Sequence, residues 1–543
     1  MKLLAHLTFA ASLFTAVPAL AQGPTVAAPA GTIEGRAQGD LRLFKGIPYA
    51  LPPVGDLRWK APVELPACQG VRKAAEFGPA CIQPRPTAVG VYTNPPAKIS
   101  EDCLTLNIWA PKNAKNAPVL VWIHGGALLS GYSNERMYDG AKLAAEGVIV
   151  VSINYRLGIL GYLAHPELSA ESGEHISGNY GLLDQIAALG WVKRNVASFG
   201  GDAGNVTIAG ESAGALSVMY LMASPKARGL FHKAIAQSAY MISTPELREA
   251  RHGAPSAEGA GVQIMKTLGA SDLAGLRAMD AEKLALGAAG AGYGPWGAVD
   301  GKVLPRQLVD TFDRGEQAPV PVIAGFNSGE IRTLRMLLPP APANAAAYEA
   351  AIRARYGDLA EAFLKRYPSD AIGESLLAAT RDALYGWTSE RLAMRQSAIG
   401  QPGYLYIFDH AYPAASEAGL HAFHAAEIPY VFGTIDSTPP YWPKVPATAQ
   451  ERQMSSAMRG YWTSFARTGS PVAKGQPAWQ PYGKARNFMA FAQKPIAGAH
   501  MMPGMYELRE AMVCRARAAG NLAWNWTTGV SSPPLPTGAP ECR

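Results

Sequence analysis

The chain has 543 residues, of which 48% are hydrophobic and 17% are charged, so it can bury a large core. Its formal net charge is +7, but the basic residues are scattered, and no stripe of basic and aromatic side chains suggests nucleic-acid binding. The surplus charge therefore aids solubility or weakly attracts anionic substrates. Length alone would suggest three or more domains, but no linker divides the sequence. We expect one domain over residues 22–543.

Residues 1–21 have the pattern of a signal peptide. Lys2 supplies a positive start, residues 3–17 form a mostly apolar stretch, and residues 19–21 match a small-x-small cleavage site. Pro18 disfavours the alternative, a buried N-terminal helix. No later apolar stretch reaches the roughly 18 residues that a membrane-spanning helix needs. The sequence thus predicts an exported protein, periplasmic or secreted, with no membrane partner.

The five cysteines of an exported chain suggest disulfides, and their odd number leaves at least one thiol unpaired or linked between chains. Cys81 and Cys103 enclose a proline-rich segment that would gain from a covalent clip. Cys514 and Cys542 both lie near the C-terminus and could pair, which would leave Cys68 over. The sequence alone does not decide between the possible pairings.

Apolar, β-rich stretches alternate with stretches of helical periodicity. This alternation predicts an α/β fold with a mostly parallel sheet covered by helices on both faces, and functional groups at the carboxyl ends of its strands. The expected central strands are residues 118–123, 147–153, 206–209, 234–237, 320–324 and 404–408. The expected helices include residues 184–194, 346–356 and 374–384.

A loop of small residues directly follows the first of these strands. His124 is followed by Gly125, Gly126 and Ala127, whose backbone N–H groups can point into a site without obstruction by side chains. Together with the N–H of Ala213, those of Gly126 and Ala127 would form a three-donor oxyanion hole. His124 could serve as a base, but its place in this motif favours a role in bracing the loop.

Residues 206–220 predict a short apolar strand, a tight Gly-Glu-Ser-Ala-Gly turn at residues 210–214, and an apolar helix. This is the Gly-x-Ser-x-Gly pattern in the strand–turn–helix context of a nucleophile elbow. Such a turn lifts the Ser212 hydroxyl above the edge of the sheet, and the following helix points its N-terminal N–H groups at the group under attack. The alternative, an ordinary glycine-rich loop, is disfavoured by the flanking strand and helix.

A serine nucleophile needs a base, and the base needs an orienting carboxylate. Glu330 ends the segment after the strand at 320–324, so it is expected at the catalytic edge of the sheet. Among ten histidines, His424 precedes Glu427 and an apolar stretch, whereas His421 looks like a solvated neighbour. The order serine, acid, histidine is that of α/β-hydrolases. An exposed glutamate and a structural histidine are the alternatives.

Long motifs over nearly all of the mature sequence resemble those of the type-B carboxylesterases, the cholinesterase and carboxylesterase group of the α/β-hydrolase fold. The motifs lie at residues 44–58, 77–81, 101–107, 154–158, 178–185 and 199–207, and include Glu-Asp-Cys-Leu-Thr-Leu-Asn at 101–107. The resemblance implies the α/β-hydrolase fold and a disulfide between Cys81 and Cys103. It further implies Ser212 as nucleophile, Glu330 as acid, His424 as base, Gly126, Ala127 and Ala213 as oxyanion hole, and Ser238 as a partner of the acid.

The sequence departs from the cholinesterases at three places. Ala127 replaces the usual third glycine of the oxyanion motif, and no tryptophan that could stack on choline lies between Cys81 and Cys103. The aromatic pair after the acid is replaced by Thr333 and Leu334, which lie between two arginines. Within the family the chain resembles the bacterial fumonisin esterases, which cleave tricarballylic side chains from a mycotoxin. Candidate substrate-pocket residues are therefore Arg332, Thr333, Leu334 and Arg335, although both arginines could face solvent.

Together these features predict an exported serine carboxylesterase that acts on a small-molecule ester through an acyl-enzyme, with no cofactor or metal. The substrate implied by the resemblance is a fumonisin-type ester. A broad esterase for small neutral esters is the alternative within enzymes. A binding protein on the same fold is a further alternative, disfavoured because the sequence keeps all three triad residues.

Overall fold

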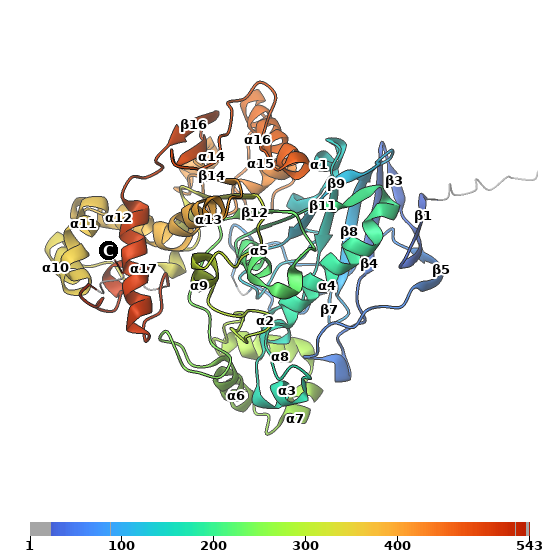
Figure 1. The fold of residues 1–543 in the computed structure, drawn as a ribbon, viewed down its shortest axis with the longest axis horizontal. Coiled ribbons are helices and arrows are strands. Elements are labelled where there is room, and N and C mark those ends of the chain that lie inside the picture. Colours follow the sequence, from blue (N-terminus) through green and yellow to red (C-terminus); the bar gives the residue numbers. More distant parts are fainter. Residues whose placement is uncertain (1–22, 87, 527, 539–541, 543) are drawn as a thin grey trace, which may run out of the picture.

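The structure is a computed structural model that describes residues 23–86, 88–526, 528–538 and 542. The signal peptide predicted at residues 1–21 lies outside these residues. One large sheet runs through the molecule with helices on both faces (Figure 1), in the strand order β16-β15-β14-β13-β12-β11-β9-β10-β8-β4-β3. Its strands are β3 (Arg36–Gln38), β4 (Leu41–Pro48), β8 (Thr105–Pro111), β9 (Ala117–Ile123), β10 (Ile149–Ile153), β11 (Gly201–Glu211), β12 (Lys233–Gln237), β13 (Val322–Asn327), β14 (Gly403–Phe408), β15 (Asn487–Phe491) and β16 (Pro495–Ala499).

The interior of this sheet is parallel, as predicted. Strands β10, β9, β11, β12, β13, β14 and β15 pair in parallel, and antiparallel strands complete both edges. The stretch predicted at residues 320–324 starts later, at Val322, and continues to Asn327. Smaller sheets comprise β1 (Thr25–Ala28), β2 (Gly31–Glu34) and β5 (Cys68–Lys73), and β6 (Ala80–Cys81) with β7 (Ile99–Ser100).

The central strands are apolar throughout because both of their faces are buried. In β9, Val119 and Val121 belong to one core cluster, whereas Leu120 and Trp122 belong to the cluster on the other face. This alternation is the two-residue period of a pleated strand. The first face is covered by α4, α5, α9 and α13, and the second by α1, α15 and α16. Their bounds are α1 (Ala141–Ala145), α4 (Tyr180–Asn195), α5 (Ala213–Ala223), α9 (Leu308–Asp313), α13 (Trp387–Ala398), α15 (Ile428–Phe432) and α16 (Ala449–Thr468).

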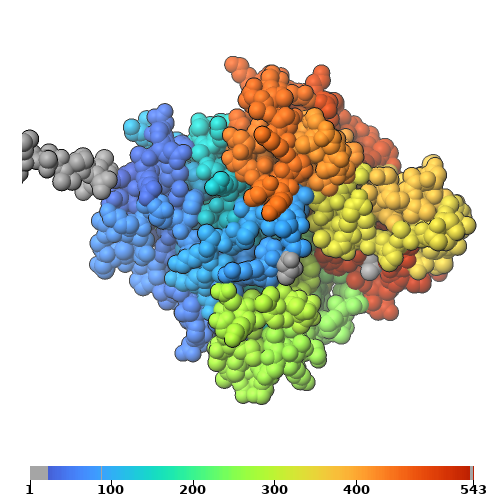
Figure 2. Space-filling view, turned by 180° about the vertical axis from the view of Figure 1, so that it is seen from behind, coloured from blue at the N-terminus to red at the C-terminus, as the bar shows by residue number. Residues whose placement is uncertain are grey.

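Two further groups of helices extend from this body, one at the bottom and one at the left of Figure 1. Figure 2 shows, from behind, that blue N-terminal segments meet the orange region of α15 and α16 above and the light-green region of α6 to α8 below. The lower group is α2 (Gly158–Tyr162), α3 (Pro166–Glu171), α6 (Ala257–Thr267), α7 (Leu273–Ala278) and α8 (Ala281–Gly290). The left group is α10 (Ala345–Tyr356), α11 (Ala360–Arg366), α12 (Ile372–Arg381) and α17 (Met505–Ala519), and the short α14 (Pro413–Glu417) lies near β14.

The helix expected at residues 374–384 differs from the prediction at its end. Helix α12 stops at Arg381, and Asp382–Gly386 form a π-helical turn that leads into α13. Apolar spacing does not distinguish a π-helical turn from α-helix, and such turns often occur at functional sites. Over the described residues, no helix combines the length and the apolar character needed to cross a membrane.

Candidate active site

The predicted elbow is a sharp turn between β11 and α5. Ser212 has a φ of 56°, an unfavourable value for a residue with a side chain, and its N–H donates to the Gln237 oxygen at 2.9 Å. A Cβ at Gly210 would lie 2.5 Å from the carbonyl carbon of Gly214, and one at Gly214 would lie 2.1 Å from the Ile123 oxygen. Only glycine fits at these two positions, as the sharpness of the turn predicts. Ser212 itself is partly exposed.

Glu330 lies beyond β13, at the start of the 3-10 helix Glu330–Arg332, and is completely buried. Its Oε1 accepts hydrogen bonds from the Ser238 hydroxyl at 2.6 Å and from the Asn327 N–H at 2.7 Å. Its Oε2 forms a short hydrogen bond with Nδ1 of His424. Because one oxygen holds the imidazole while the other is fixed by two donors, the carboxylate sets the orientation of the ring.

His424 belongs to a loop that is fastened to the acid loop. The Gly329 N–H donates to the Ala422 oxygen at 2.8 Å, and the Asn327 side chain donates to the Phe423 oxygen at 2.8 Å. Asn327 also donates to Glu427 at 2.6 Å. The base loop and the end of β13 are therefore one hydrogen-bonded unit, in which His424 is buried.

A second carboxylate, Glu211 of the elbow, lies beside the other ring nitrogen. Its Oε1 is 3.0 Å from Nε2 of His424 but makes no hydrogen bond with any described residue. Burial alone would lower the pKa of His424, but the Glu211 and Glu330 carboxylates outweigh burial and raise it. Burial raises the pKa of Glu211. Protonation of one of these two groups therefore affects the other.

The loop after β9 has the strained backbone of an anion-binding loop. The φ values are 103° at Gly126, 56° at Ala127 and 58° at Leu128. Within the described residues, the N–H groups of Gly126 and Ala127 donate to no protein acceptor, and both residues are exposed. Ala213 is the first residue of α5, where N–H groups lack partners inside the helix. These donors are available to an oxyanion.

His124 is buried below this loop. Its Nδ1 lies 2.9 Å from the Gly125 oxygen, and its ring stacks on Tyr155 with the ring centroids 4.6 Å apart. Burial lowers its pKa to about 4, so it is neutral at physiological pH. These contacts agree with a bracing role. Across the described ranges, no group of three or more His, Cys, Asp or Glu is arranged to hold a metal ion.

Comparison with known proteins identifies the family. The model of the carboxylesterase family matches residues 22–506. Fumonisin B1 esterase of Sphingopyxis macrogoltabida is 36% identical over 505 residues, which cover 89% of this chain and 90% of that protein. Para-nitrobenzyl esterase of Bacillus subtilis (strain 168) is 37% identical over 450 residues, covering 81% of this chain and 89% of that protein. The chain belongs to the carboxylesterase family.

The solved structures agree. A PNB esterase structure superposes with a TM-score of 0.76 at 32% identity, covering 89% of this chain and 99% of that one. The carboxylesterase has the α/β-hydrolase fold and is a serine hydrolase that acts on carboxylic ester bonds. The expectations of fold class and reaction class from the sequence are therefore confirmed.

The four candidate pocket residues of the carboxylesterase have different surroundings. Arg332 forms an ion pair with Glu374 at 2.6 Å, so its charge is already compensated. Arg335 is exposed and forms no ion pair with a described residue. Thr333 lies 2.6 Å from the hydroxyl of Tyr92, whereas Leu334 packs against the main core.

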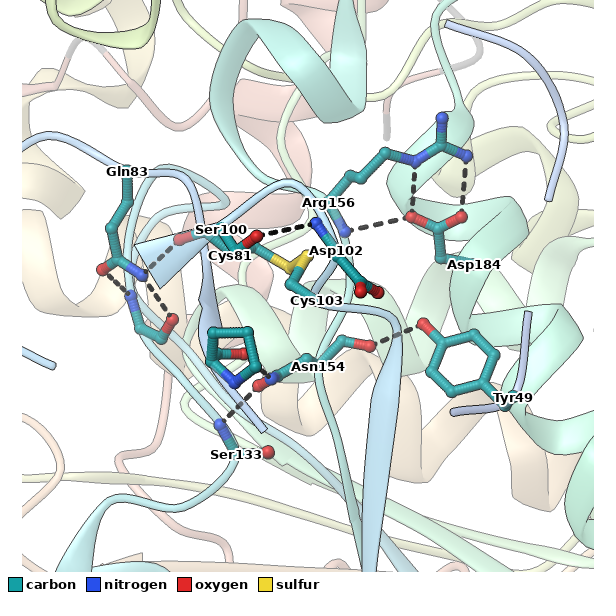
Figure 3. Close-up of a disulfide and its surroundings, with 12 residues drawn as sticks. Tyr49, Cys81, Gln83, Ser100, Asp102, Cys103, Ser133, Asn154, Arg156 and Asp184 are labelled. Atoms are coloured by element: carbon teal, nitrogen blue, oxygen red, sulfur yellow. Dashed lines mark hydrogen bonds and ion pairs between the residues drawn. A yellow bond between two sulfur atoms is a disulfide. The ribbon is translucent and has the colours of Figure 1, made fainter. Parts of the chain in front are cut away.

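Both disulfides considered from the sequence are present. Cys81 is bonded to Cys103 (Figure 3) and Cys514 to Cys542, and Cys68 is a free, partly exposed cysteine. The Cys81–Cys103 bond closes a loop between residues 22 positions apart in the sequence. Tyr92, which lies in this loop, donates a hydrogen bond to the backbone oxygen of His424.

Tyr92, Gln237 and Asn327 are among the residues of this site that sequence reasoning missed. Gln237 and Asn327 bind the carboxylate of Glu427 at 2.8 and 2.6 Å, and both end a central strand, which was the available signal. Tyr92 lies between Cys81 and Cys103, 332 positions from its partner His424, and no local pattern signals this contact.

Proposed function

We propose that this carboxylesterase hydrolyses its substrate through an acyl-enzyme on Ser212. Neutral His424 takes the proton from the Ser212 hydroxyl as its oxygen attacks the ester carbonyl. The alcohol then leaves with that proton, and a water activated by His424 hydrolyses the acyl-enzyme. The observation that supports these roles best is the bond of Nδ1 of His424 to Glu330, which leaves Nε2 on the elbow side.

The developing oxyanion would be held by the N–H groups of Gly126, Ala127 and Ala213. These donors need no reorganisation during the reaction, because the strained loop and the first turn of α5 hold them in place. Ser238 fixes Glu330 and so supports the orientation of the base. A methyl group at Ala127 adds bulk beside the acyl group, in keeping with selectivity for the acyl part.

Replacement of the nucleophile tests this proposal. Ser212→Ala should lower kcat by at least about a thousandfold while the melting temperature stays unchanged. A matched control is Ser224→Ala, which removes a buried hydroxyl just beyond the far end of α5 that has no hydrogen-bond partner among the described residues. Intact-mass analysis should show an acyl adduct in the wild type, and none in Ser212→Ala. Near-native turnover in Ser212→Ala would exclude the proposed mechanism.

We further propose that the preferred esters carry free carboxylates on their acyl part, as in tricarballylic esters of the fumonisin type. The support is the 36% identity to fumonisin B1 esterase over most of both chains, the net charge of +7, and the uncompensated Arg335 close to the acid loop. The test is kcat/KM for a tricarballylate half-ester and for its fully methylated analogue. A preference of about tenfold or more for the acid is expected. Equal rates would instead favour a broad esterase for neutral esters.

Export is the third part of the proposal. The predicted signal peptide and the two disulfides, which persist in oxidising compartments, support it. Cell fractionation with N-terminal sequencing of the mature protein tests it. A mature chain that starts after Ala21 in the periplasm or medium is expected, and an uncleaved cytoplasmic chain would contradict it.

A further inference from the structure

Tyr92 links the two loops that position the candidate triad. Its hydroxyl donates to the backbone oxygen of His424 at 2.7 Å and lies 2.6 Å from the hydroxyl oxygen of Thr333. A phenol has one proton, and the carbonyl of His424 can only accept. The Thr333 hydroxyl must therefore donate to Tyr92. The three groups form a directed chain from the acid loop, through Tyr92, to the base itself.

The hydrogen bond from Tyr92 is made to the backbone of the base residue itself. In the part of the chain that the structure describes, Tyr92 is the only hydrogen-bond donor to the carbonyl of His424. The Tyr92 ring also meets the imidazole edge-on, with centroids 6.4 Å apart, and contacts Trp442 in the same way at 6.0 Å. On the π-helical turn, Tyr385 packs on the imidazole at 5.3 Å. The backbone and the ring of His424 are thus both held by aromatic residues.

The same disulfide-closed segment also holds the loop of the oxyanion hole. The Gln83 amide donates to the Gly131 oxygen at 3.0 Å and accepts from the Gly131 N–H at 2.9 Å. It also donates to the Cys81 oxygen at 3.0 Å, beside the disulfide in Figure 3. A Cβ on Gly131 would lie 2.5 Å from Nδ1 of His124, so Gly131 backs the oxyanion motif directly.

We propose that residues 81–86 and 88–103, which we call the clamp segment, position the catalytic machinery. Tyr92 fixes the base loop relative to the acid loop, and Gln83 fixes the oxyanion loop. Tyr92, Thr333 and Gln83 are positioning residues, because Tyr92 and Thr333 act through the loops of His424 and Glu330, and Gln83 acts through Gly131. The inference rests on the proposed function, since it presupposes these roles. The disulfide and the adjoining parallel pair of β6 and β7 anchor the two ends of the clamp segment.

The decisive variant is Tyr92→Phe, which keeps the ring and removes both hydrogen bonds. Loss of one such bond at a buried group costs up to roughly a factor of ten, so kcat should fall about tenfold. KM should stay unchanged, and the melting temperature should fall by only a few degrees, as in the control below. The matched control is Tyr348→Phe, which loses a phenol bond to the Tyr367 oxygen, 3.0 Å away in the α10 region, and should keep wild-type kcat. Wild-type kcat in Tyr92→Phe, or an equal loss in the control, would overturn the proposal.

Thr333 supplies a rescue test. Thr333→Val should lower kcat several-fold because Tyr92 loses its donor, and Thr333→Ser should restore it. In the Tyr92→Phe background, Thr333→Val should cause little further loss, since the shared bond is already gone. Fully additive losses would contradict the directed chain.

The oxyanion arm needs a separate readout. Gln83→Leu should lower kcat/KM and weaken binding of a boronic acid transition-state analogue by a similar factor. Unchanged analogue affinity would remove Gln83 from the proposal. Ser212→Ala, measured in parallel, distinguishes failure of the proposed mechanism from failure of the proposed role of the clamp segment. If Ser212→Ala is inactive but Tyr92→Phe matches the wild type, only the proposed role of the clamp segment is wrong. If Ser212→Ala is active, the proposed catalytic mechanism is wrong.

Discussion

Two regions of the molecule bury ionisable groups in opposite ways. At the carboxyl edge of the sheet, the carboxylates of Glu211, Glu330 and Glu427 surround His424, and no arginine or lysine among the described residues forms an ion pair with them. We call this set the carboxylate cluster. At the junction of α12, α13 and α17, the carboxylate of Asp382 lies among arginines.

The second set comprises Asp382 with Arg366, Arg381 and Arg509; we call it the arginine cluster, and its carboxylate is hydrogen-bonded. Asp382 accepts from Arg381 at 2.8 Å and from the Tyr367 hydroxyl at 2.8 Å. Arg509 donates to Thr528 at 2.7 Å and to the Ala379 oxygen at 2.6 Å. A hydrogen-bonded network of this kind joins helices that are distant in sequence.

The two clusters show that burial alone does not set a pKa. Burial acts in the same direction on Glu211 and Asp382, since both carboxyls are buried. The pKa of Glu211 is raised, because burial prevails over His424 and neighbouring carboxylates add to it. The pKa of Asp382 is lowered, because Arg381, Arg366 and Arg509 outweigh burial. The paired charges around Asp382 favour stability. The unpaired carboxylates around His424 instead favour binding of a proton close to the reacting group.

The largest effect expected from this comparison is the loss of the base. His424→Ala should lower kcat by about a thousandfold or more, because Ser212 loses its proton acceptor. The exposed His421 offers a matched control, and His421→Ala should keep most activity. Steady-state kinetics on a simple ester measure both. Comparable losses in the two variants would show that His424 is not the base.

A substitution in the arginine cluster should lower the stability of the protein and leave catalysis largely unchanged. Asp382→Asn removes the counter-charge of the partly buried Arg366 and Arg381 and of the buried Arg509, which costs about 3 kcal/mol of unfolding free energy. Denaturant unfolding measures this loss, and the activity that remains per folded molecule should change far less than in His424→Ala. Asp358→Asn, which removes an exposed partner of Arg515, is the control with little effect.

The pH dependence sharpens this prediction. Because the pKa of Asp382 is lowered on folding, its contribution is present above the unfolded value of about 3.9 and is lost as pH falls through the folded value. The difference in stability between the wild type and Asp382→Asn should therefore shrink at acid pH. A constant difference would mean that the carboxylate charge is not the cause.

The carboxylate cluster should be revealed by a pH profile. His424 must be neutral to act, and the charge of Glu211 raises the pKa of His424. Wild-type kcat/KM should therefore rise as the pH passes this raised pKa. Glu211→Gln removes that charge and should move this limb to lower pH by about one unit. Asp358→Asn again provides a control for a distant carboxylate. An unmoved limb would show that Glu211 does not set the protonation of the base.

Much of the fold could be predicted from the sequence, because central strands and elbow leave local signals. Strand β9 is continuously apolar, and the glycines around Ser212 are the only residues that fit their turn. The π-helical turn at Asp382–Gly386 could not be predicted, because its apolar spacing continues that of α12. Its geometry depends on tertiary contacts, among them the packing of Tyr385 on His424.

The candidate site was predictable only where a motif encodes it. Ser212, Glu330 and His424 lie in motifs whose order along the chain is informative. The bond from Tyr92 to His424 joins residues 332 positions apart, and nothing local to either residue indicates it. The same holds for Arg332, whose pairing with Glu374 spans 42 positions and changes what its charge can do.

The smallest expected effects concern the two arginines after the acid, and they test whether charge compensation also governs substrate selection. Arg332 is paired with Glu374, which is 64% exposed, whereas Arg335 has no ion pair among the described residues. An exposed pair contributes about 1 kcal/mol at most, so neither Arg332→Ala nor Arg335→Ala should unfold the protein. If free carboxylates on the acyl part are recognised here, Arg335→Ala should lower the ratio of kcat/KM for the tricarballylate half-ester to that for its methylated analogue by a few-fold. Arg332→Ala should lower this ratio less, and Glu374→Gln should raise it because Arg332 is then uncompensated. An equal ratio in all four proteins would place any selectivity for acidic esters elsewhere in the molecule.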